Sequence, residues 1–302
     1  KKMLEFLSQE LKIKATLESH LELDLGLDSL SRVELGLGLE KLFNINIPDE
    51  SISEVFTVRD LVTKISQLVI QGQSQTQPQI HQPSWSQIIR QPPNDEILKK
   101  INLTPKTFNK IFTSIIIGCM RVFLRLFCGL KIEGSGNIPF NKPFIICPNH
   151  SSFLDGFVIA SSLSLKTEIN LFFLGYSGYF QHPVISWAIK IARLIAIDPA
   201  INLTDAMQAA GYVLRNNKGL CIFPEGERSI NAEVKDFKKG VGILIKETDA
   251  AVIPCYIKGA YNSWPRGQKL PRPHPVKIIF GSPCTKEELK EAGSKYKDED
   301  EY

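Results

Sequence analysis

Apolar and polar positions follow a helical period in the first 70 residues of the chain. The stretches with this period are MLEFLSQEL, SLSRVELGLGLEKLF and TVRDLVTKISQLV. The second stretch begins near Ser29, where Ser31 and Glu34 have the spacing of a capping box, and Thr57 is placed as the N-cap of the third. This part of the chain predicts a small all-α bundle.

Later in the chain, short apolar runs followed by turn signals alternate with helical segments. The runs that predict strands are PFIICPN, NLFFLG, LIAID, LCIFPEG, AVIPCYI and VKIIFGSP. The helical segments between them are GFVIASSL, HPVISWAIKIA, TDAMQAAGYVLRNN and FKKGVGILIKET. This alternation is typical of an α/β domain with a largely buried central sheet, which we expect to be mixed.

The composition of the remaining segments sets the predicted domain boundaries. We predict a bundle over residues 1–70, a linker over 71–96, basic amphipathic helices over 97–132, an α/β domain over 133–285 and a charged tail over 286–302. The linker is rich in Gln and Pro and has little to bury, although an interaction tail has the same composition. As a flexible chain of about 25 residues it would span roughly 25–30 Å.

Residues 97–132 contain no acidic residue and seven lysines or arginines among many Ile, Phe and Leu residues. Basic amphipathic helices bind the membrane interface through apolar burial and attraction to anionic lipid. The most apolar stretch, Phe108 to Leu130, is interrupted by Arg121 and Arg125, which argues against a membrane span. The alternative is a core helix with a solvated basic edge.

The charge balance differs between the two parts of the chain. Residues 1–70 carry 8 Lys/Arg and 12 Asp/Glu, a net charge of −4, so the remainder of the 36 and 32 in the chain gives 28 against 20, a net charge of +8. The chain lacks the aromatic-basic interleaving of single-strand binders, so we expect no nucleic-acid partner. The six cysteines form no C-x-x-C pair and the five histidines are scattered, which indicates reduced thiols in a cytoplasmic protein and no metal site.

The stretch DLGLDSLSRVEL places Ser29 at the start of a helix, where a serine is most simply an N-cap. The whole segment over about residues 3–70 nevertheless resembles the acyl carrier protein family, in its acidity, its size and its Asp28-Ser29-Leu30 core. The resemblance implies a four-helix carrier bundle with the cofactor 4′-phosphopantetheine esterified to Ser29. Arg32 stands where many carriers have an acidic residue, which implies a difference in partner docking.

The stretch PNHSSFLDG places His150 and Asp155 five residues apart after the strand-like FIIC. This is not the spacing of one face of a regular helix, so a turn is needed to bring the carboxylate onto the imidazole. In that arrangement Asp155 fixes the tautomer while His150 takes a proton. A nucleophilic Ser151 or Ser152 is disfavoured because the chain has no G-x-S-x-G elbow. A capped turn with a satisfied histidine is the structural alternative.

A second turn, IFPEGERS, follows another strand-like run. Pro224 and Gly226 shape it, and Glu225 and Arg228 add a hydrogen-bonding carboxylate and a bidentate cation. A turn of this composition suits an anionic head group. The alternative is a surface turn with a salt bridge.

Over about residues 105–285 these motifs together resemble the glycerolipid acyltransferase family, whose members include 1-acylglycerol-3-phosphate and lysophospholipid acyltransferases. The H-x4-D pair of the family corresponds to His150 and Asp155, and its V-I-P element to Val252, Ile253 and Pro254. Its F-P-E-G-x-R-S element is complete in Phe223, Pro224, Glu225, Gly226, Arg228 and Ser229. The resemblance implies catalysis by His150 and Asp155, and binding of the acceptor phosphate by Glu225, Gly226 and Arg228.

One departure from the family bears on the acceptor. Where the family usually has an arginine that grips a phosphomonoester, this chain has Asp198 and Pro199, and Arg193 is a weak substitute. In this respect the chain is similar to the acyltransferase half of bifunctional acyl-carrier synthetase/lysophospholipid acyltransferases. We therefore expect a phosphodiester lysophospholipid as the acceptor as readily as a phosphomonoester.

The two resemblances imply transfer of a fatty acyl group to the free hydroxyl of a lysophospholipid or 1-acylglycerol-3-phosphate in phospholipid synthesis or remodelling. The donor is an acyl thioester on CoA or on a carrier, including the chain's own. A membrane surface is the implied partner, at the cytoplasmic inner face. Because the chain opens as KKMLEF within a helical pattern, we also expect an acyl-activating ligase upstream in the same chain. The competing hypotheses are a non-catalytic membrane-docked carrier module and an acyltransferase with a non-glycerolipid acceptor.

Overall fold

The computed structural model of the chain divides into two compact units, residues 1–84 with 198–206 and residues 85–197 with 207–302. The structure describes residues 3, 6–7, 15–22, 24–27, 29–43, 45, 47, 51–52, 55–72, 84–175, 193–197 and 203–294. The helix predicted from HPVISWAIKIA lies outside the described residues, as do Asp198 and Pro199.

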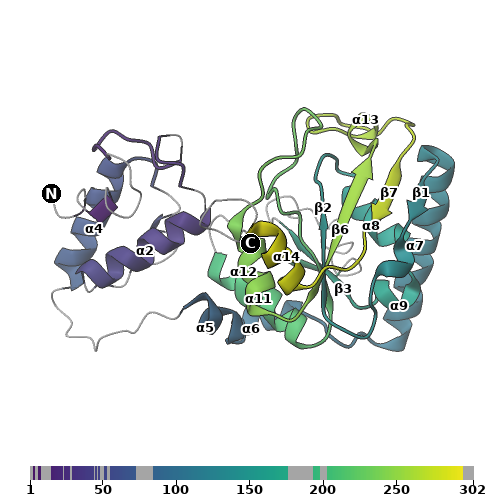
Figure 1. Cartoon of the computed structure of the whole chain (residues 1–302), viewed down its shortest axis with the longest axis horizontal. Helices are drawn as coiled ribbons and strands as arrows, with labels where there is room; N and C mark the ends of the chain where they lie inside the picture. Colours follow the sequence, from purple (N-terminus) through teal and green to yellow (C-terminus); the bar gives the residue numbers. More distant parts are fainter. Residues whose placement is uncertain are drawn as a thin grey trace. The chain divides into compact units, whose positions relative to one another are not determined.

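In the first unit, helices α2 (Ser29–Phe43) and α4 (Val58–Gly72) match two of the predicted helices (Figure 1). Thr57 caps α4 as the sequence predicts, because its Oγ1 accepts a hydrogen bond from the Asp60 N–H at 3.2 Å and the Asp60 carboxylate accepts one from the Thr57 N–H at 3.1 Å. The core of this unit includes the buried side chains of Met3, Leu7, Leu21, Leu27, Leu35, Leu39, Ile52, Val58, Leu61 and Ile65. A helical unit with its own apolar core agrees with the predicted bundle, and the number of four helices remains a prediction.

The second unit is built on a mixed sheet, in the strand order β1-β7-β6-β2-β5-β3-β4. The strands are β1 (Lys131–Glu133), β2 (Phe144–Pro148), β3 (Leu171–Gly175), β4 (Leu194–Ala196), β5 (Gly219–Cys221), β6 (Ala251–Lys258) and β7 (Lys277–Phe280). β2 to β6 run parallel, and β7 pairs with β6 in the antiparallel sense. The six apolar runs therefore form strands as predicted, whereas β1 lies at the end of the segment expected to be helical.

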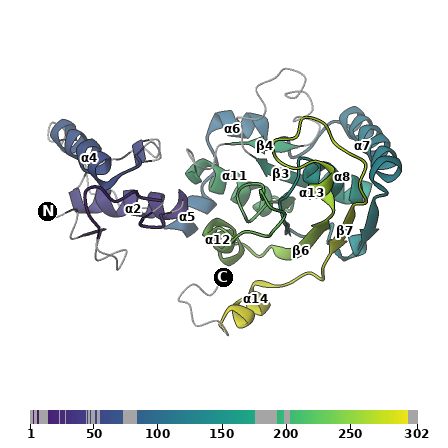
Figure 2. The same cartoon turned by 90° about the horizontal axis from the view of Figure 1, so that it is seen from above.

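Helices cover both faces of this sheet, with α7, α8 and α9 on one side and α11 and α12 on the other (Figures 1 and 2). The described helices of the second unit are α5 (Trp85–Arg90), α6 (Asp95–Lys100), α7 (Thr107–Cys128), the 3₁₀ helix η1 (Ser135–Asn137), α8 (Asp155–Ser162), α9 (Leu165–Glu168), α11 (Leu203–Arg215, in this unit from residue 207), α12 (Lys239–Glu247), α13 (Ala260–Ser263) and α14 (Lys286–Gly293). Because both faces are covered, central strands such as Phe144–Pro148 are apolar at consecutive positions.

Helix α5 lies inside the segment that its composition predicts to be a linker. Ile88 and Ile89 on α5 are buried, and the Arg215 guanidinium on α11 donates a hydrogen bond to the Ile89 carbonyl. A Cβ at Gly211 would come within 2.5 Å of that same carbonyl oxygen, so the glycine permits the close approach of α5 to α11. The apolar pair in WSQII thus places the end of the predicted linker in the core of the second unit.

Helix α7 runs through the segment predicted to be basic and amphipathic. Among the described residues it is the one helix long and apolar enough to cross a membrane, a test that buried core helices also pass. Its exposed apolar side chains include Phe108, Ile111, Phe112, Ile115, Val122, Phe123 and Leu126. The Arg121 guanidinium donates to the carbonyls of Ser161 and Leu163 at the end of α8, so this charge is satisfied within the protein.

A buried carboxylate lies beside Arg121. Glu168 on α9 is 6% exposed, and within the described part of the chain neither of its side-chain oxygens has a hydrogen-bond partner. Burial raises the pKa of Glu168 to about 7, although the charges of Arg121 and Arg193 act in the opposite direction. The folded protein therefore holds a proton on this carboxyl more tightly than the unfolded chain does.

We expect Glu168→Gln to stabilise the second unit above pH 7 and to leave its stability nearly unchanged near pH 4.5. A raised folded-state pKa contributes stability that is fully present below the unfolded value of 4.5 and is lost as the pH rises to about 7. Glutamine removes this loss, which a shift of this size puts at no more than about 3 kcal/mol once solvent screening is allowed for. Urea unfolding of both proteins across this pH range measures it, with the exposed Glu287→Gln as control; parallel pH curves for wild type and Glu168→Gln would contradict the assignment.

Candidate active site

The predicted pair of His150 and Asp155 is brought together at the carboxyl end of β2. His150 follows the strand by two residues, and Asp155 is the first residue of α8. The imidazole Nδ1 lies 2.9 Å from the Asp155 Oδ2, with the histidine side chain 21% exposed and the aspartate fully buried. This contact leaves Nε2 as the ring nitrogen available to a substrate proton.

The turn between the two residues holds the carboxylate in place. The Asp155 Oδ2 also accepts hydrogen bonds from the backbone N–H groups of Ser151 at 2.7 Å and Ser152 at 2.8 Å. The Ser152 hydroxyl donates to the Trp264 carbonyl at 2.8 Å and accepts from the Leu154 N–H at 3.1 Å. The Ser152 side chain therefore stabilises the turn through these two hydrogen bonds.

Glu225 in the second turn holds the backbone of His150. Glu225 is 2% exposed; its Oε1 accepts from the His150 N–H at 2.7 Å, and its Oε2 accepts from the Lys235 N–H at 3.1 Å. The Ser229 N–H in turn donates to the His150 carbonyl at 2.7 Å. Gly226 has a φ of 75°, in the left-handed region that glycine occupies without strain. The structure thus gives Glu225 a positioning role that the sequence did not predict, while its binding of an acceptor phosphate remains a prediction.

Two aromatic rings complete the surroundings of the pair. The Phe223 ring stacks on the His150 imidazole, with centroids 3.8 Å apart and an interplanar angle of 20°. The Arg228 guanidinium carbon lies 3.5 Å from the centroid of the Phe153 ring, and Arg228 is 7% exposed. A cation on an aromatic face gains electrostatic stabilisation. The sequence predicted no role for Phe153 or Phe223, although Phe223 is part of the F-P-E-G motif.

Hydrogen bonds from β6 and from the residue after α13 also hold the turn between His150 and Asp155. The Asn149 side chain accepts a hydrogen bond from the Ile257 N–H at 2.6 Å and donates to the Ile257 carbonyl at 3.1 Å. The Trp264 carbonyl, just after α13, accepts from the Phe153 N–H at 3.3 Å. The sequence carried no signal for Trp264, because its contribution is a backbone carbonyl.

The cysteines near the site are unsuited to nucleophilic catalysis. Burial raises the pKa of the Cys147 thiol to about 12 and that of the Cys255 thiol still further. Both thiols are therefore neutral at pH 7, and all six cysteines of the chain are free. In the part of the chain that the structure describes, no three His, Cys, Asp or Glu side chains gather as metal ligands would.

Arg193, weighed as a substitute for the family's phosphate-gripping arginine, points to the other end of the sheet. Its guanidinium donates to the carbonyls of Asn102 and Ile169, before β3 begins, whereas His150 follows the end of β2. Burial lowers the pKa of Arg193 to about 10, so the side chain remains a cation at pH 7. Its observed contacts are structural.

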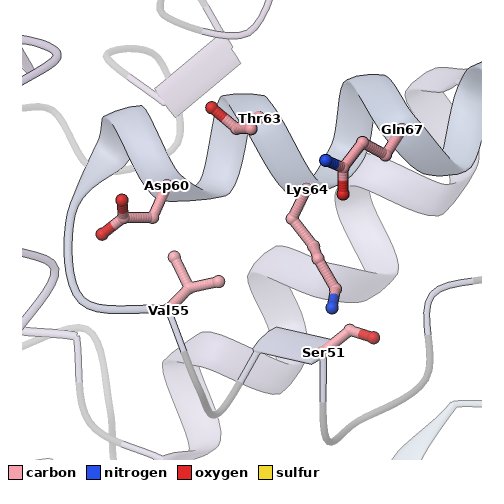
Figure 3. A pocket seen from close by; sticks show the side chains of 6 residues that line it. All are labelled: Ser51, Val55, Asp60, Thr63, Lys64 and Gln67. Carbon is pink, nitrogen blue, oxygen red and sulfur yellow. The ribbon is translucent and has the colours of Figure 1, made fainter.

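Ser29 is the first residue of α2, as the carrier resemblance requires. The first turn of this helix contains no acidic residue, and the N–H groups at a helix start favour a phosphate. The position therefore fits a phosphopantetheine phosphodiester. A separate open pocket of about 260 Å³ on the first unit is lined by Ser51, Val55, Asp60, Thr63, Lys64 and Gln67, and contains none of the predicted site residues (Figure 3).

Comparison with known proteins assigns both segments. Residues 129–258 match the acyltransferase family, and residues 1–65 match the family described as phosphopantetheine attachment site. The first match contains His150, Asp155, Glu225 and Arg228, and the second contains Ser29. The chain therefore contains one segment that matches the phosphopantetheine attachment site family and one that matches the acyltransferase family, which confirms the two resemblances.

Individual relatives agree with this assignment. A chloroplast 1-acyl-sn-glycerol-3-phosphate acyltransferase of Arabidopsis thaliana is 31% identical over 147 residues, covering 47% of this chain and 40% of the plant protein. The Bacillus subtilis 1-acyl-sn-glycerol-3-phosphate acyltransferase is 23% identical, covering 54% and 78%. The crystal structure of the acyltransferase PlsC from Thermotoga maritima superposes with a TM-score of 0.51 at 25% identity, covering 68% of this chain and 81% of that one. The chain spans less than half the length of the plant relative.

Proposed function

We propose that the chain is an O-acyltransferase that moves a fatty acyl group from a thioester to the free hydroxyl of a lysophospholipid or 1-acylglycerol-3-phosphate. The observation that carries the proposal is the His150–Asp155 contact of 2.9 Å at the carboxyl end of β2. The matched family and the activities for which the relatives are named support the reaction class.

In the proposed mechanism His150 acts as the general base. Its Nε2 removes the proton of the acceptor hydroxyl while the hydroxyl oxygen bonds to the thioester carbonyl carbon. The carbon–sulfur bond then breaks, the thiolate leaves, and His150 passes its proton to the sulfur. Asp155 stabilises the imidazolium in between. The transfer is direct and forms no acyl-enzyme.

The acceptor head group is proposed to lie near the second turn. Arg228 belongs to this turn, and its guanidinium packs over the ring of Phe153. Phe153 lies between His150 and Asp155 in the sequence, so Arg228 is close to the catalytic pair. Its planar guanidinium matches phosphate geometry. A phosphomonoester and a phosphodiester both fit this chemistry, and the named relatives act on the phosphomonoester.

The donor is proposed to be an acyl thioester on CoA or on 4′-phosphopantetheine attached to Ser29. When bound, this group carries the acyl chain as a thioester. Ser29 at the start of α2 would hold its phosphate, and the match of residues 1–65 to the attachment-site family supports the assignment.

The protein is proposed to work on the cytoplasmic inner face of a membrane, bound peripherally through α7. The exposed apolar positions of α7, from Phe108 to Leu126, recur at helical spacing along one face of the helix. Lys110 and Arg125 add positive charge along the same helix, and Lys106 lies at its N-terminal end. Such a surface gains free energy from apolar burial and from anionic lipid.

Vesicles that contain single lysophospholipids provide the test. With acyl-CoA as donor, we expect thiol release and diacyl product with acceptors bearing a phosphomonoester or phosphodiester, and little with a monoacylglycerol that lacks phosphate. The protein should float with anionic vesicles in a density gradient. No product with any acceptor would favour the non-catalytic carrier or a non-glycerolipid acceptor, and preferred acylation of the monoacylglycerol would contradict binding of the acceptor through its phosphate.

A further inference from the structure

Glu227 occupies the variable position of the second turn and pairs with two cations from different segments. Its Oε1 lies 2.6 Å from the Lys235 Nζ, and its Oε2 lies 3.2 Å from the Arg266 Nη1. Lys235 belongs to the loop that follows Ser229, and Arg266 follows α13. One carboxylate thus holds two cations that are distant in the sequence.

Both cations are anchored to the catalytic turn through other contacts. The Lys235 N–H binds the Glu225 carboxylate, whose second oxygen binds the His150 N–H. Arg266 follows Trp264 by two residues, and the Trp264 carbonyl accepts from the Ser152 hydroxyl. The two side chains therefore lie beside the same turn as Arg228.

The ion pairs themselves add little to the stability of the fold. The side chains of Glu227, Lys235 and Arg266 are 57%, 32% and 48% exposed, and exposed pairs contribute about 0–1 kcal/mol. The hydrogen bond from Lys235, followed by that from Arg266, lowers the pKa of Glu227, so the group is ionised at neutral pH. A single carboxylate against two cations leaves one net positive charge in the cluster, which a phosphate oxyanion can use.

We propose that Lys235 and Arg266 bind the phosphate of the acceptor head group, and that the Glu227 carboxylate occupies their donors in the free protein. The proposal rests on the proposed function and adds two residues to the predicted acceptor site at Arg228. On binding, phosphate oxygens replace the Glu227 oxygens at the ammonium and guanidinium groups, and no covalent bond changes. Glu227 therefore competes with the acceptor.

Steady-state kinetics with the full chain tests this competition. We expect Lys235→Met and Arg266→Met each to raise the KM for a phosphate-bearing acceptor about fivefold, with kcat and the KM for acyl-CoA nearly unchanged. Glu227→Gln should instead lower the acceptor KM, because it removes the competing charge. Lys286→Met, which breaks a surface pair with Asp249 at 2.7 Å, is the matched control and should change neither KM.

Three outcomes separate the possibilities. If Glu227→Gln raises the acceptor KM as much as the cation variants do, the three residues only shape the loop and the inference is wrong. If both cation variants leave the acceptor KM unchanged while the wild type is active, the head group binds elsewhere. If the wild type transfers no acyl group to any acceptor, the proposed function itself fails. Thermal melting of each variant checks that the fold is retained.

Discussion

Replacing His150 with Ala is expected to lower the rate of acyl transfer by about 10²- to 10⁴-fold. The imidazole is held at Nδ1 by the buried Asp155 carboxylate and on its face by the Phe223 ring, so its Nε2 is the base that the site offers a hydroxyl. Alanine leaves the acceptor oxygen protonated as it approaches the thioester. Because the base acts in the chemical step, the loss should appear in kcat more than in either KM.

His274→Ala is the matched control for this variant. The His274 Nδ1 lies 3.1 Å from the carbonyl oxygen of its neighbour Pro275, a local contact that has no part in the proposed chemistry, so its removal should leave kcat unchanged. Added imidazole should restore part of the rate of His150→Ala, because a free base can enter the space of the lost ring. Retention of more than about a tenth of the wild-type kcat would refute the assignment of His150 as the general base.

The regular part of the fold was predictable because local patterns determine it. Six apolar runs became β2 to β7, and the parallel strands β2, β3 and β5 are buried at consecutive positions because helices cover both faces of the sheet. Helix α5 was not predictable from composition. Its six residues lie in a Gln- and Pro-rich stretch, and its helix is stabilised by burial of Ile88 and Ile89 and by Arg215 from a distant part of the chain. Long-range contacts of this kind leave no periodic signal in the sequence.

The residues of the candidate site likewise include some that could be predicted from the sequence and others that could not. His150 and Asp155 were found from the sequence because five residues of one turn contain both groups and their chemistry is local. The positioning role of Glu225 was not found from the sequence, because a carboxylate close to an arginine suggests a head-group site. In the structure its two oxygens instead accept hydrogen bonds from the backbone N–H groups of His150 and Lys235. The pairing of Glu227 with Arg266 joins segments 39 residues apart, and no spacing rule predicts it.

Replacing Ser29 with Ala is expected to abolish loading with 4′-phosphopantetheine and, with it, acyl transfer from the chain's own carrier. Alanine has no hydroxyl to form the phosphodiester at the start of α2. Transfer from free acyl-CoA should continue at the wild-type rate, because His150 and Asp155 are untouched. Two measurements test this prediction. The mass of the protein after treatment with a phosphopantetheinyl transferase reports loading, and the product yield from each donor reports transfer. Ser31→Ala, in the same helix, is the control and should still be loaded.

A mixture of two chains, each unable to perform carrier-dependent transfer within itself, then decides whether the carrier-bound donor acts within one molecule. Ser29→Ala lacks the carrier attachment and His150→Ala lacks the base, so product from the mixture requires transfer between chains. A covalent link between donor and site gives an effective concentration on the order of mM, which dilution does not change. At low micromolar protein we therefore expect fast carrier-dependent transfer from the wild type and slow, concentration-dependent transfer from the mixture. Equal rates would show that the carrier serves other chains as readily as its own, and unchanged carrier-dependent turnover in Ser29→Ala alone would overturn the attachment site.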